Sequence, residues 1–198
     1  TRGYIKAISP IIGPYIDAPG PDMGTPPMVM DWMTDEFGKQ IRKSRDRKLA
    51  DNEILATFTG KPVAKGGSKG REEATGKGGI FVLLSLLKVL HKSNKYKLNH
   101  KPITVAVQGF GNLGFHFARI AHDEGFQVVA VSDSKHVIYV PEGLDPVQVA
   151  QCKKQSGTLA NCFCKKNGCE VKNGELITHE QLLELPVDIL VPAAIENV

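Results

Sequence analysis

The sequence predicts an α/β protein with a doubly wound domain in its second half, and three observations support this. An apolar run, ITVAVQ at residues 103–108, reads as a buried strand, and a glycine-rich turn and a helix follow it at once. A second β-rich run, QVVAVSDS at residues 127–134, contains Asp133 close to its end. Strand, glycine turn, helix and strand make a βαβ unit with a right-handed crossover, which is typical of a Rossmann-like domain. We expect the domain to be incomplete, because the sequence stops at Val198 before six strands are finished.

More short elements are expected after this unit. VIYV at 137–140 reads as a strand and DPVQVAQCKKQ at 145–155 as a helix. THEQLLEL at 178–185 reads as another helix, and VDILVPAA at 187–194 as a further buried strand. The Rossmann-like domain is therefore expected to cover residues 102–198.

The first half of the sequence is expected to hold helices and stiff loops. Residues 2–16 read as the end of an amphipathic helix, and a second helix is expected over 26–37 with Thr25 as its cap. The basic stretch 39–53 has no clear period. From Arg71 or Glu72 a long helix runs to about Lys92; it is apolar on nearly every face, so we expect it to be buried between layers. We assign residues 1–70 to a first domain and 71–101 to this connecting helix and a basic linker.

Composition excludes some classes of protein. The chain is 41% hydrophobic and 23% charged, which suits a folded domain, and it has no run of 18 apolar residues, so we expect no membrane span. Its basic stretches, 39–48 and 91–101, contain Tyr96 as their one aromatic residue and read as solvated faces, so we expect no nucleic-acid partner. No secretory leader precedes the first helix, which predicts a cytoplasmic location and a chain that is a fragment or processed piece.

The glycine turn predicts a dinucleotide site. Gly109, Gly111 and Gly114 form G-x-G-x-x-G between a strand and a helix, and Asp133 follows the next strand. In this motif the first glycine makes the tight turn, the second admits a pyrophosphate and the third lets helix and sheet pack closely. An acidic residue at Asp133 would accept from a ribose 2′-hydroxyl, which favours NAD, while Lys135 and His136 leave NADP open. The expected cofactor contacts here are Gly109, Phe110, Gly111, Asn112, Leu113, Gly114, Asp133 and Ser134.

Two further loops are unusual. DAPGPDMGT at residues 17–25 holds one carboxylate, Asp22, between rigid turn-formers, and the stretch by itself reads as a surface turn. In TGKPVAKGGSKGREEATGKGG at 59–79, glycines precede a helix start with Arg71 and Thr75 in its first turn. A helix N-terminus with these side chains can hold an anion such as a cofactor phosphate, and the alternative is a flexible loop.

Seven motifs follow one another at sensible intervals: APGPDMGT, MDWMTDEF, TGKP, GGSKGREEATG, VQGFGNLG, AVSDSK and VDILVPAAIENV. The series resembles the glutamate dehydrogenases of the Glu/Leu/Phe/Val dehydrogenase family over almost the whole chain. The leucine, phenylalanine and valine branches share the Rossmann half, but their loop before the long helix differs. GGSKGREEATG therefore favours the glutamate branch.

The resemblance implies a fold, an activity and several roles. Residues 1–70 would be the C-terminal part of an α/β catalytic domain in an oxidoreductase, a hexamer in this family, that deaminates L-glutamate to 2-oxoglutarate and ammonia with NAD(P). Asp22 matches the family's proton carrier, and a rigid carboxylate in a closed cleft suits that task. Thr59, with Gly20 and Pro21 beside Asp22, matches the substrate pocket. Positions that match cofactor contacts are Thr75, Asn112, Ala193 and Ala194.

The sequence departs from the family pattern in several places. The family's catalytic lysine, the lysines that grip the substrate carboxylates and a downstream serine have no counterpart in these residues, so we expect the chain by itself to be inactive. Gly20 stands where alanine is usual. His136 and Val137 replace a common Gly-Gly pair, which leaves the choice between NAD and NADP open.

Four cysteines, Cys152, Cys162, Cys164 and Cys169, fall within eighteen residues. Four thiols can bind zinc tetrahedrally, but the spacing lacks paired C-x-x-C knuckles. We expect no metal and ordinary reduced thiols, with zinc as the alternative, and a cytoplasmic location disfavours disulfides.

Two other functions remain open on the sequence. A non-catalytic dinucleotide-binding module would explain the missing lysine, and a related dehydrogenase could act on a branched or aromatic amino acid. The leading hypothesis is an NAD(P)-dependent glutamate dehydrogenase.

Overall fold

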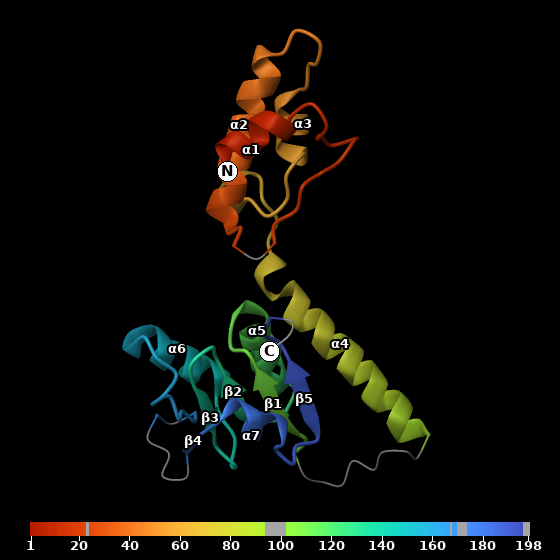
Figure 1. The fold of residues 1–198 in the computed structure, drawn as a ribbon. Helices are drawn as coiled ribbons and strands as arrows, with labels where there is room; N and C mark the ends of the chain where they lie inside the picture. The colour runs from red at the N-terminus through yellow and green to blue at the C-terminus, as the bar shows by residue number, and fades with distance from the viewer. Residues whose placement is uncertain (23, 94–101, 167, 170–173, 196–198) are drawn as a thin grey trace. The chain divides into compact units, whose positions relative to one another are not determined.

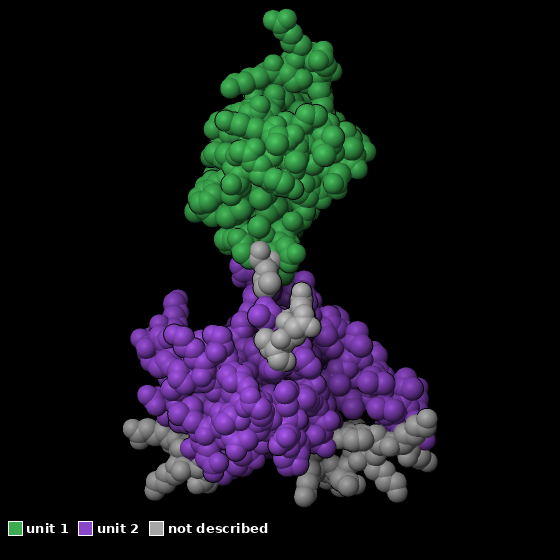
Figure 2. All heavy atoms as spheres, in the orientation of Figure 1, with its two compact units in different colours: residues 1–71 green, residues 72–198 purple. Residues whose placement is uncertain are grey.

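The computed structural model describes residues 1–198 except 23, 94–101, 167, 170–173 and 196–198. The basic linker and Tyr96 thus lie largely outside the described residues. The chain forms two compact units, Thr1–Arg71 and Glu72–Val198, which Figure 2 colours separately. The long helix that we assigned to a connecting segment clusters with the second unit.

The first unit is a small group of helices around one core (Figure 1). Its elements are α1 (Arg2–Ile8), α2 (Pro27–Lys43), α3 (Asp51–Ala56) and the short 3-10 helix η1 (Val63–Lys65). Their apolar faces meet in a cluster of fully buried side chains: Ile5, Ile12, Met30, Phe37, Ile41, Ile54 and Phe58.

The helix boundaries differ from the sequence prediction in this unit. The first helix stops at Ile8 rather than near residue 16, because Pro10 has no N–H to continue the helical hydrogen bonds. The second helix continues through the basic stretch to Lys43. Thr25 does not cap it; Pro26 is the cap residue, and the Thr25 hydroxyl bonds Asp22 instead.

A buried lysine closes the end of α3. Lys61 is 5% exposed, and its ammonium donates to the carbonyl oxygen of Leu55 at 2.8 Å and to that of Phe58. Burial lowers the pKa of Lys61 below the ordinary 10.5. The last carbonyls of a helix lack partners within it, so this lysine acts as a C-terminal cap.

Lys61→Met is expected to lower the free energy of unfolding by about 1–3 kcal/mol, because it leaves buried carbonyls without a donor. Urea denaturation followed by circular dichroism measures this. Lys65→Met is the matched control, since the ion pair of Lys65 with Asp31 has a 60% exposed lysine and should contribute little. Equal losses in the two variants would contradict the capping role.

The second unit is a five-stranded sheet with helices on both faces. Its strands are β1 (Thr104–Gln108), β2 (Gln127–Ser132), β3 (Val137–Tyr139), β4 (Glu175–Ile177) and β5 (Ile189–Pro192), in the order β4-β3-β2-β1-β5. Strand β1 is parallel to both of its neighbours, β2 and β5. Strand β3 pairs antiparallel with β2, and β4 pairs antiparallel with β3. The predicted βαβ unit, with α5 (Asn112–Asp123) as its helix, is confirmed.

Alternate residues of β1 face two different helix layers. Val105 and Val107 join the core formed with α5 and α6 (Pro146–Ser156), while Ala106 faces Leu182 of α7 (His179–Leu183). The predicted helices over 145–155 and 178–185 are confirmed, each with a side-chain cap, Asp145 and Thr178 respectively. Strand β5 is half exposed rather than buried, because β1 is its only paired neighbour among the described strands.

The long helix α4 (Arg71–Lys92) has the predicted bounds but not the predicted burial. Gly76 lets it approach α5 closely, since a Cβ there would lie 2.7 Å from the Phe117 nitrogen. Its opposite face is open, with Val82 71% exposed, because the described residues cover only one face of the helix. By length and composition alone, it is the one helix among the described residues that could cross a membrane.

Candidate functional site

The three glycines of the turn after β1 occupy three different environments. Gly109 has φ of +96°, and a Cβ there would lie 2.7 Å from the Ala193 carbonyl oxygen. A Cβ on Gly114 would lie 1.7 Å from the Gly109 oxygen, so only glycine lets α5 pack this closely on the turn. At Gly111 an added Cβ would meet nothing within 4 Å. The middle glycine therefore faces open space at the N-terminus of α5.

The turn is walled by the end of β5. The Ala193 amide donates to the Gln108 carbonyl oxygen at 2.7 Å, and the Gly109 amide donates to the Ser132 hydroxyl at 2.9 Å. Ala193 and Ala194 thus lie directly against the glycine turn, although they are more than eighty positions away in the sequence.

The side chains of the turn have mainly structural contacts. Phe110 is 6% exposed and stacks edge-on against Phe115, so only its backbone is available to a cofactor. Asn112 donates from Nδ2 to the Glu72 carbonyl oxygen at 2.8 Å, which joins the first turns of α4 and α5. Leu113 is half-buried, and Thr75 is exposed one position before the Gly76 contact.

Asp133 follows β2 and is held from both sides. One carboxylate oxygen accepts from the Lys135 and His136 amides, both at 2.9 Å, and the other pairs with the Lys153 ammonium of α6 at 2.8 Å. Burial raises the pKa of this carboxyl, but the Lys153 and backbone hydrogen bonds outweigh it, and the pKa is lowered from 3.8. The stability that ionisation adds is therefore present above pH 3.8 and lost as pH falls through the lowered value.

The Lys153 contact is a feature that the sequence analysis missed. Lys153 and Asp133 are 31% and 17% exposed, so the pair is partly screened from water. No spacing rule links an acidic strand end to a lysine in the following helix, and only the placement of α6 beside β2 reveals it. Ser134, the next predicted contact, is exposed.

In the first unit, the Asp22 loop is held against the residues that follow α3. The Asp22 amide donates to the Thr25 hydroxyl at 2.6 Å, and that hydroxyl donates to the Asp22 carbonyl oxygen at 2.5 Å. A Cβ on Gly20 would touch the Thr59 hydroxyl at 3.5 Å, so these two positions are neighbours. Arg71 donates to the Pro21 carbonyl oxygen at 3.0 Å and so supports this loop.

The predicted site residues thus fall into two groups. Within the first unit the structure brings together Gly20, Pro21, Asp22, Thr59 and Arg71. Within the second, the glycine turn is flanked by the first turn of α4 and the end of β5, with Asp133 after the neighbouring strand β2.

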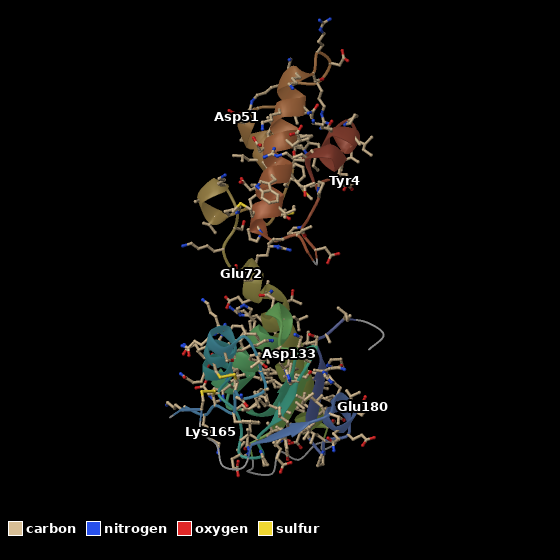
Figure 3. All side chains as sticks on the ribbon, turned by 60° about the vertical axis from the view of Figure 1, so that its left-hand side comes forward. Tyr4, Asp51, Glu72, Asp133, Lys165 and Glu180 are labelled. Atoms are coloured by element: carbon tan, nitrogen blue, oxygen red, sulfur yellow. A yellow bond between two sulfur atoms is a disulfide. The ribbon has the colours of Figure 1, made fainter. Side chains whose placement is uncertain are left out.

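The cysteines differ from the expectation of reduced thiols. They are joined as two disulfides, Cys152–Cys162 and Cys164–Cys169, which appear as yellow bonds near Lys165 in Figure 3. The sequence could not show this, because the pairing depends on how α6 packs against the residues that follow it.

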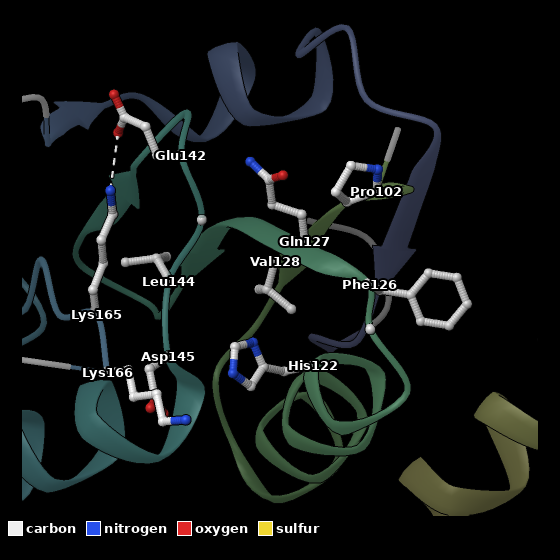
Figure 4. A pocket seen from close by; sticks show the side chains of 12 residues that line it. Pro102, His122, Phe126, Gln127, Val128, Glu142, Leu144, Asp145, Lys165 and Lys166 are labelled. Atoms are coloured by element: carbon white, nitrogen blue, oxygen red, sulfur yellow. Dashed lines mark ion pairs between the residues drawn. The ribbon is translucent and has the colours of Figure 1, made fainter. Parts of the chain in front are cut away.

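A cavity of about 290 Å³ lies away from the glycine turn (Figure 4). It is lined near the start of β2 by residues such as His122, Gln127 and Val128, and it is bordered by the Lys165–Glu142 ion pair at 3.5 Å. Cofactors bind outside the carboxyl ends of parallel strands, and this cavity lies at the opposite end of β2. We therefore do not assign it to the dinucleotide.

Comparison with known proteins identifies the family of the chain. Residues 66–198 match the model of the Glutamate/Leucine/Phenylalanine/Valine dehydrogenase family, and residues 1–39 match the dimerisation domain of the same enzymes. The chain is 42% identical over 197 residues to an NADP-specific glutamate dehydrogenase of Synechocystis and 43% identical over 198 residues to a glutamate dehydrogenase of Thermotoga maritima. Each match covers the whole of this chain but only 42% of the length of the relative.

A solved structure shows the same fold. The hetero-hexameric glutamate dehydrogenase of Thermus thermophilus superposes with a TM-score of 0.75 at 31% identity, covering 98% of this chain and 40% of that one. The match spans both units of the chain, and the family model covers the α4 region together with the whole Rossmann-like sheet. The chain therefore belongs to the Glu/Leu/Phe/Val dehydrogenase family.

Proposed function

We propose that this chain is part of an NAD(P)-dependent glutamate dehydrogenase, which converts L-glutamate to 2-oxoglutarate and ammonia and catalyses the reverse amination. The observation that carries the proposal is the glycine turn. Gly111 leaves space beside the free N–H groups of α5, and Asp133 ends the adjacent strand, so the residues present fit a dinucleotide. The names of the relatives, NADP-specific in Synechocystis and NAD-specific in Bacillus subtilis, support a nicotinamide cofactor.

Glutamate is favoured over the branched and aromatic substrates by the relatives, which are named glutamate dehydrogenases. The same names favour an enzyme over a non-catalytic dinucleotide-binding module. Gly20 and Thr59 are neighbours beside Asp22, which is where we propose that the substrate side chain lies.

Asp22 is proposed to move the protons of the reaction. A nicotinamide dinucleotide held at the glycine turn would take hydride from the substrate Cα, and water would add to the resulting iminium. Proton transfer between the amine and that water needs a base that is held in a fixed position. The bonds of Thr25 to the Asp22 amide and carbonyl oxygen, with the Arg71 bond to Pro21, restrain the backbone at Pro21 and Asp22.

The complete coding sequence tests the proposal. We expect the purified full-length protein to reduce NAD or NADP with L-glutamate, and to do so far faster than with leucine or phenylalanine. Reduction driven best by leucine or phenylalanine would assign a different branch of the family. Dinucleotide binding without turnover of any of the three would support a binding module instead.

We propose that the chain binds NAD more tightly than NADP, and that Lys153 reduces this difference in affinity. Asp133 would repel a 2′-phosphate, while the Lys153 ammonium 2.8 Å from it would attract one. Asp133→Ser is expected to shift the ratio of the two dissociation constants about tenfold toward NADP, and Lys153→Gln about tenfold toward NAD. Calorimetric titration with both cofactors measures the ratio.

Lys154→Gln is the matched control, because Lys154 neighbours Lys153 on α6 but is exposed. It should leave the ratio unchanged. Shifts in the same direction for Asp133→Ser and Lys153→Gln would refute the opposing roles of the two charges.

We further propose that the full-length enzyme is cytoplasmic and a homo-oligomer, with a hexamer as the expected state. The match of residues 1–39 to a dimerisation domain and the hetero-hexamer of Thermus thermophilus support assembly.

A further inference from the structure

The two disulfides lie close together. Cys152 is bonded to Cys162, and Cys164 to Cys169. The sulfur atoms of Cys152, Cys164 and Cys169 all lie within 4.8 Å of one another. Three of the four sulfur atoms thus form one group, and Cys162 is joined to it through its bond to Cys152.

Three separate segments supply these sulfur atoms. Cys152 lies in the last turns of α6, and Cys162 and Cys164 lie in the loop that follows it. Cys164 and Cys169 flank a tight hairpin in which Lys165 and Gly168 exchange two backbone hydrogen bonds of 2.8 and 3.0 Å. This bridge brings Cys164 and Cys169, one on each side of it, together as two neighbouring ligands.

The spacing of the sulfur atoms suits a tetrahedral ion. Zinc–thiolate bonds of about 2.3 Å place the four sulfur atoms of a tetrahedral site about 3.8 Å apart. The sulfur atoms of Cys152, Cys164 and Cys169 lie within 4.8 Å of one another, so reduction of the two disulfides would leave these ligands close to the required separation, with Cys162 beside Cys152. We propose that the four cysteines, when reduced, bind one zinc ion, and that the two disulfides are the oxidised, ion-free form.

The surroundings shield the site and offer it a hydrogen-bond donor. Cys162 and Cys164 are fully buried, which protects them from solvent. The Ser156 hydroxyl lies 3.9 Å from the Cys162 sulfur and can donate to it. Thiolate ligands select soft or borderline ions such as zinc over magnesium or calcium.

The chemistry balances without a further component. Each disulfide takes two electrons and two protons from a dithiol, which becomes a disulfide, or two electrons from a phosphine, with water supplying both protons and the oxygen of the phosphine oxide. The four resulting thiols then release their protons as the metal binds. Four protein ligands leave no open position, so the ion is structural and takes no part in catalysis. It would fix the last turns of α6 to the loop and hairpin that follow.

The test uses the complete chain, reduced with a phosphine under anaerobic conditions and titrated with zinc chloride. We expect one zinc ion per chain, with four thiols protected from alkylation by the ion. Titration with cobalt chloride should give the intense sulfur-to-cobalt absorption of a tetrahedral tetrathiolate site. Cys164→Ser should weaken zinc binding by more than the roughly 10- to 100-fold that loss of an outer partner costs.

Asn161→Ser, an exposed neighbour in the same loop, is the matched control and should bind zinc as the parent does. The proposal is overturned if the reduced parent shows four reactive thiols and no stoichiometric zinc. It is also overturned if cobalt binds without the tetrathiolate absorption, a result that does not depend on whether any variant folds.

Discussion

Gly111→Val is expected to abolish tight dinucleotide binding while the fold stays intact. Nothing lies within 4 Å of the added Cβ, so the substitution meets no protein atom at that position, but a branched side chain would occupy the space proposed for the pyrophosphate. Loss of charge-assisted hydrogen bonds worth about 1.5–3 kcal/mol each should weaken binding about 100-fold or more. Calorimetry with NAD and with NADP measures the loss.

Two further glycines provide the comparison. Gly3→Val also places a side chain in open space, but in α1, and should bind cofactor normally. Gly114→Val should instead destabilise the second unit, because its Cβ would overlap the Gly109 oxygen. If Gly111→Val bound the cofactor with normal affinity, the assignment of the dinucleotide site to this turn would be wrong.

Asp22→Asn is expected to lower kcat of the full-length enzyme about 10²- to 10⁴-fold, the usual contribution of a general acid–base group. Asparagine keeps the size of the side chain and the backbone bonds to Thr25, so the loop should stay in place. Cofactor affinity should be close to normal, since the glycine turn belongs to a different unit. Steady-state kinetics with glutamate and calorimetry with the cofactor measure the two effects separately.

Asp17→Asn, at the start of the same loop and also exposed, is the matched control and should retain full activity. If Asp22→Asn retained more than about half of kcat, the aspartate would be a turn residue and not a proton carrier.

The βαβ unit was predictable because its signals are local. Apolar runs at 103–108 and 127–134 flank a glycine turn, and each signal depends only on neighbouring residues. The same is true of α6, where Asp145 caps the first turn and Pro146 begins it. Local signals do not reveal what covers an element, so the exposed face of α4 and the half-exposed β5 were predicted wrongly as buried.

Contacts between distant segments could not be predicted either. The Lys153–Asp133 pair and the support that Arg71 gives to Pro21 depend on how helices and loops pack after they form. Lys61 is a further example. The motif TGKP matches the family, but its neighbouring residues do not show that the lysine is buried against the carbonyl oxygens of Leu55 and Phe58.

The sheet order has a consequence for the sequence of folding events during synthesis. Strand β1 pairs on one side with β2, close in the chain, and on the other with β5, where Thr104 and Asp188 exchange hydrogen bonds of 2.9–3.0 Å across 84 residues. Pairings over short separations form first, and loop-closure entropy delays the distant ones. A growing chain can therefore assemble β1 to β4 before β5 leaves the ribosome. Because Ala193 supplies the wall of the glycine turn, the turn becomes complete only when β5 docks.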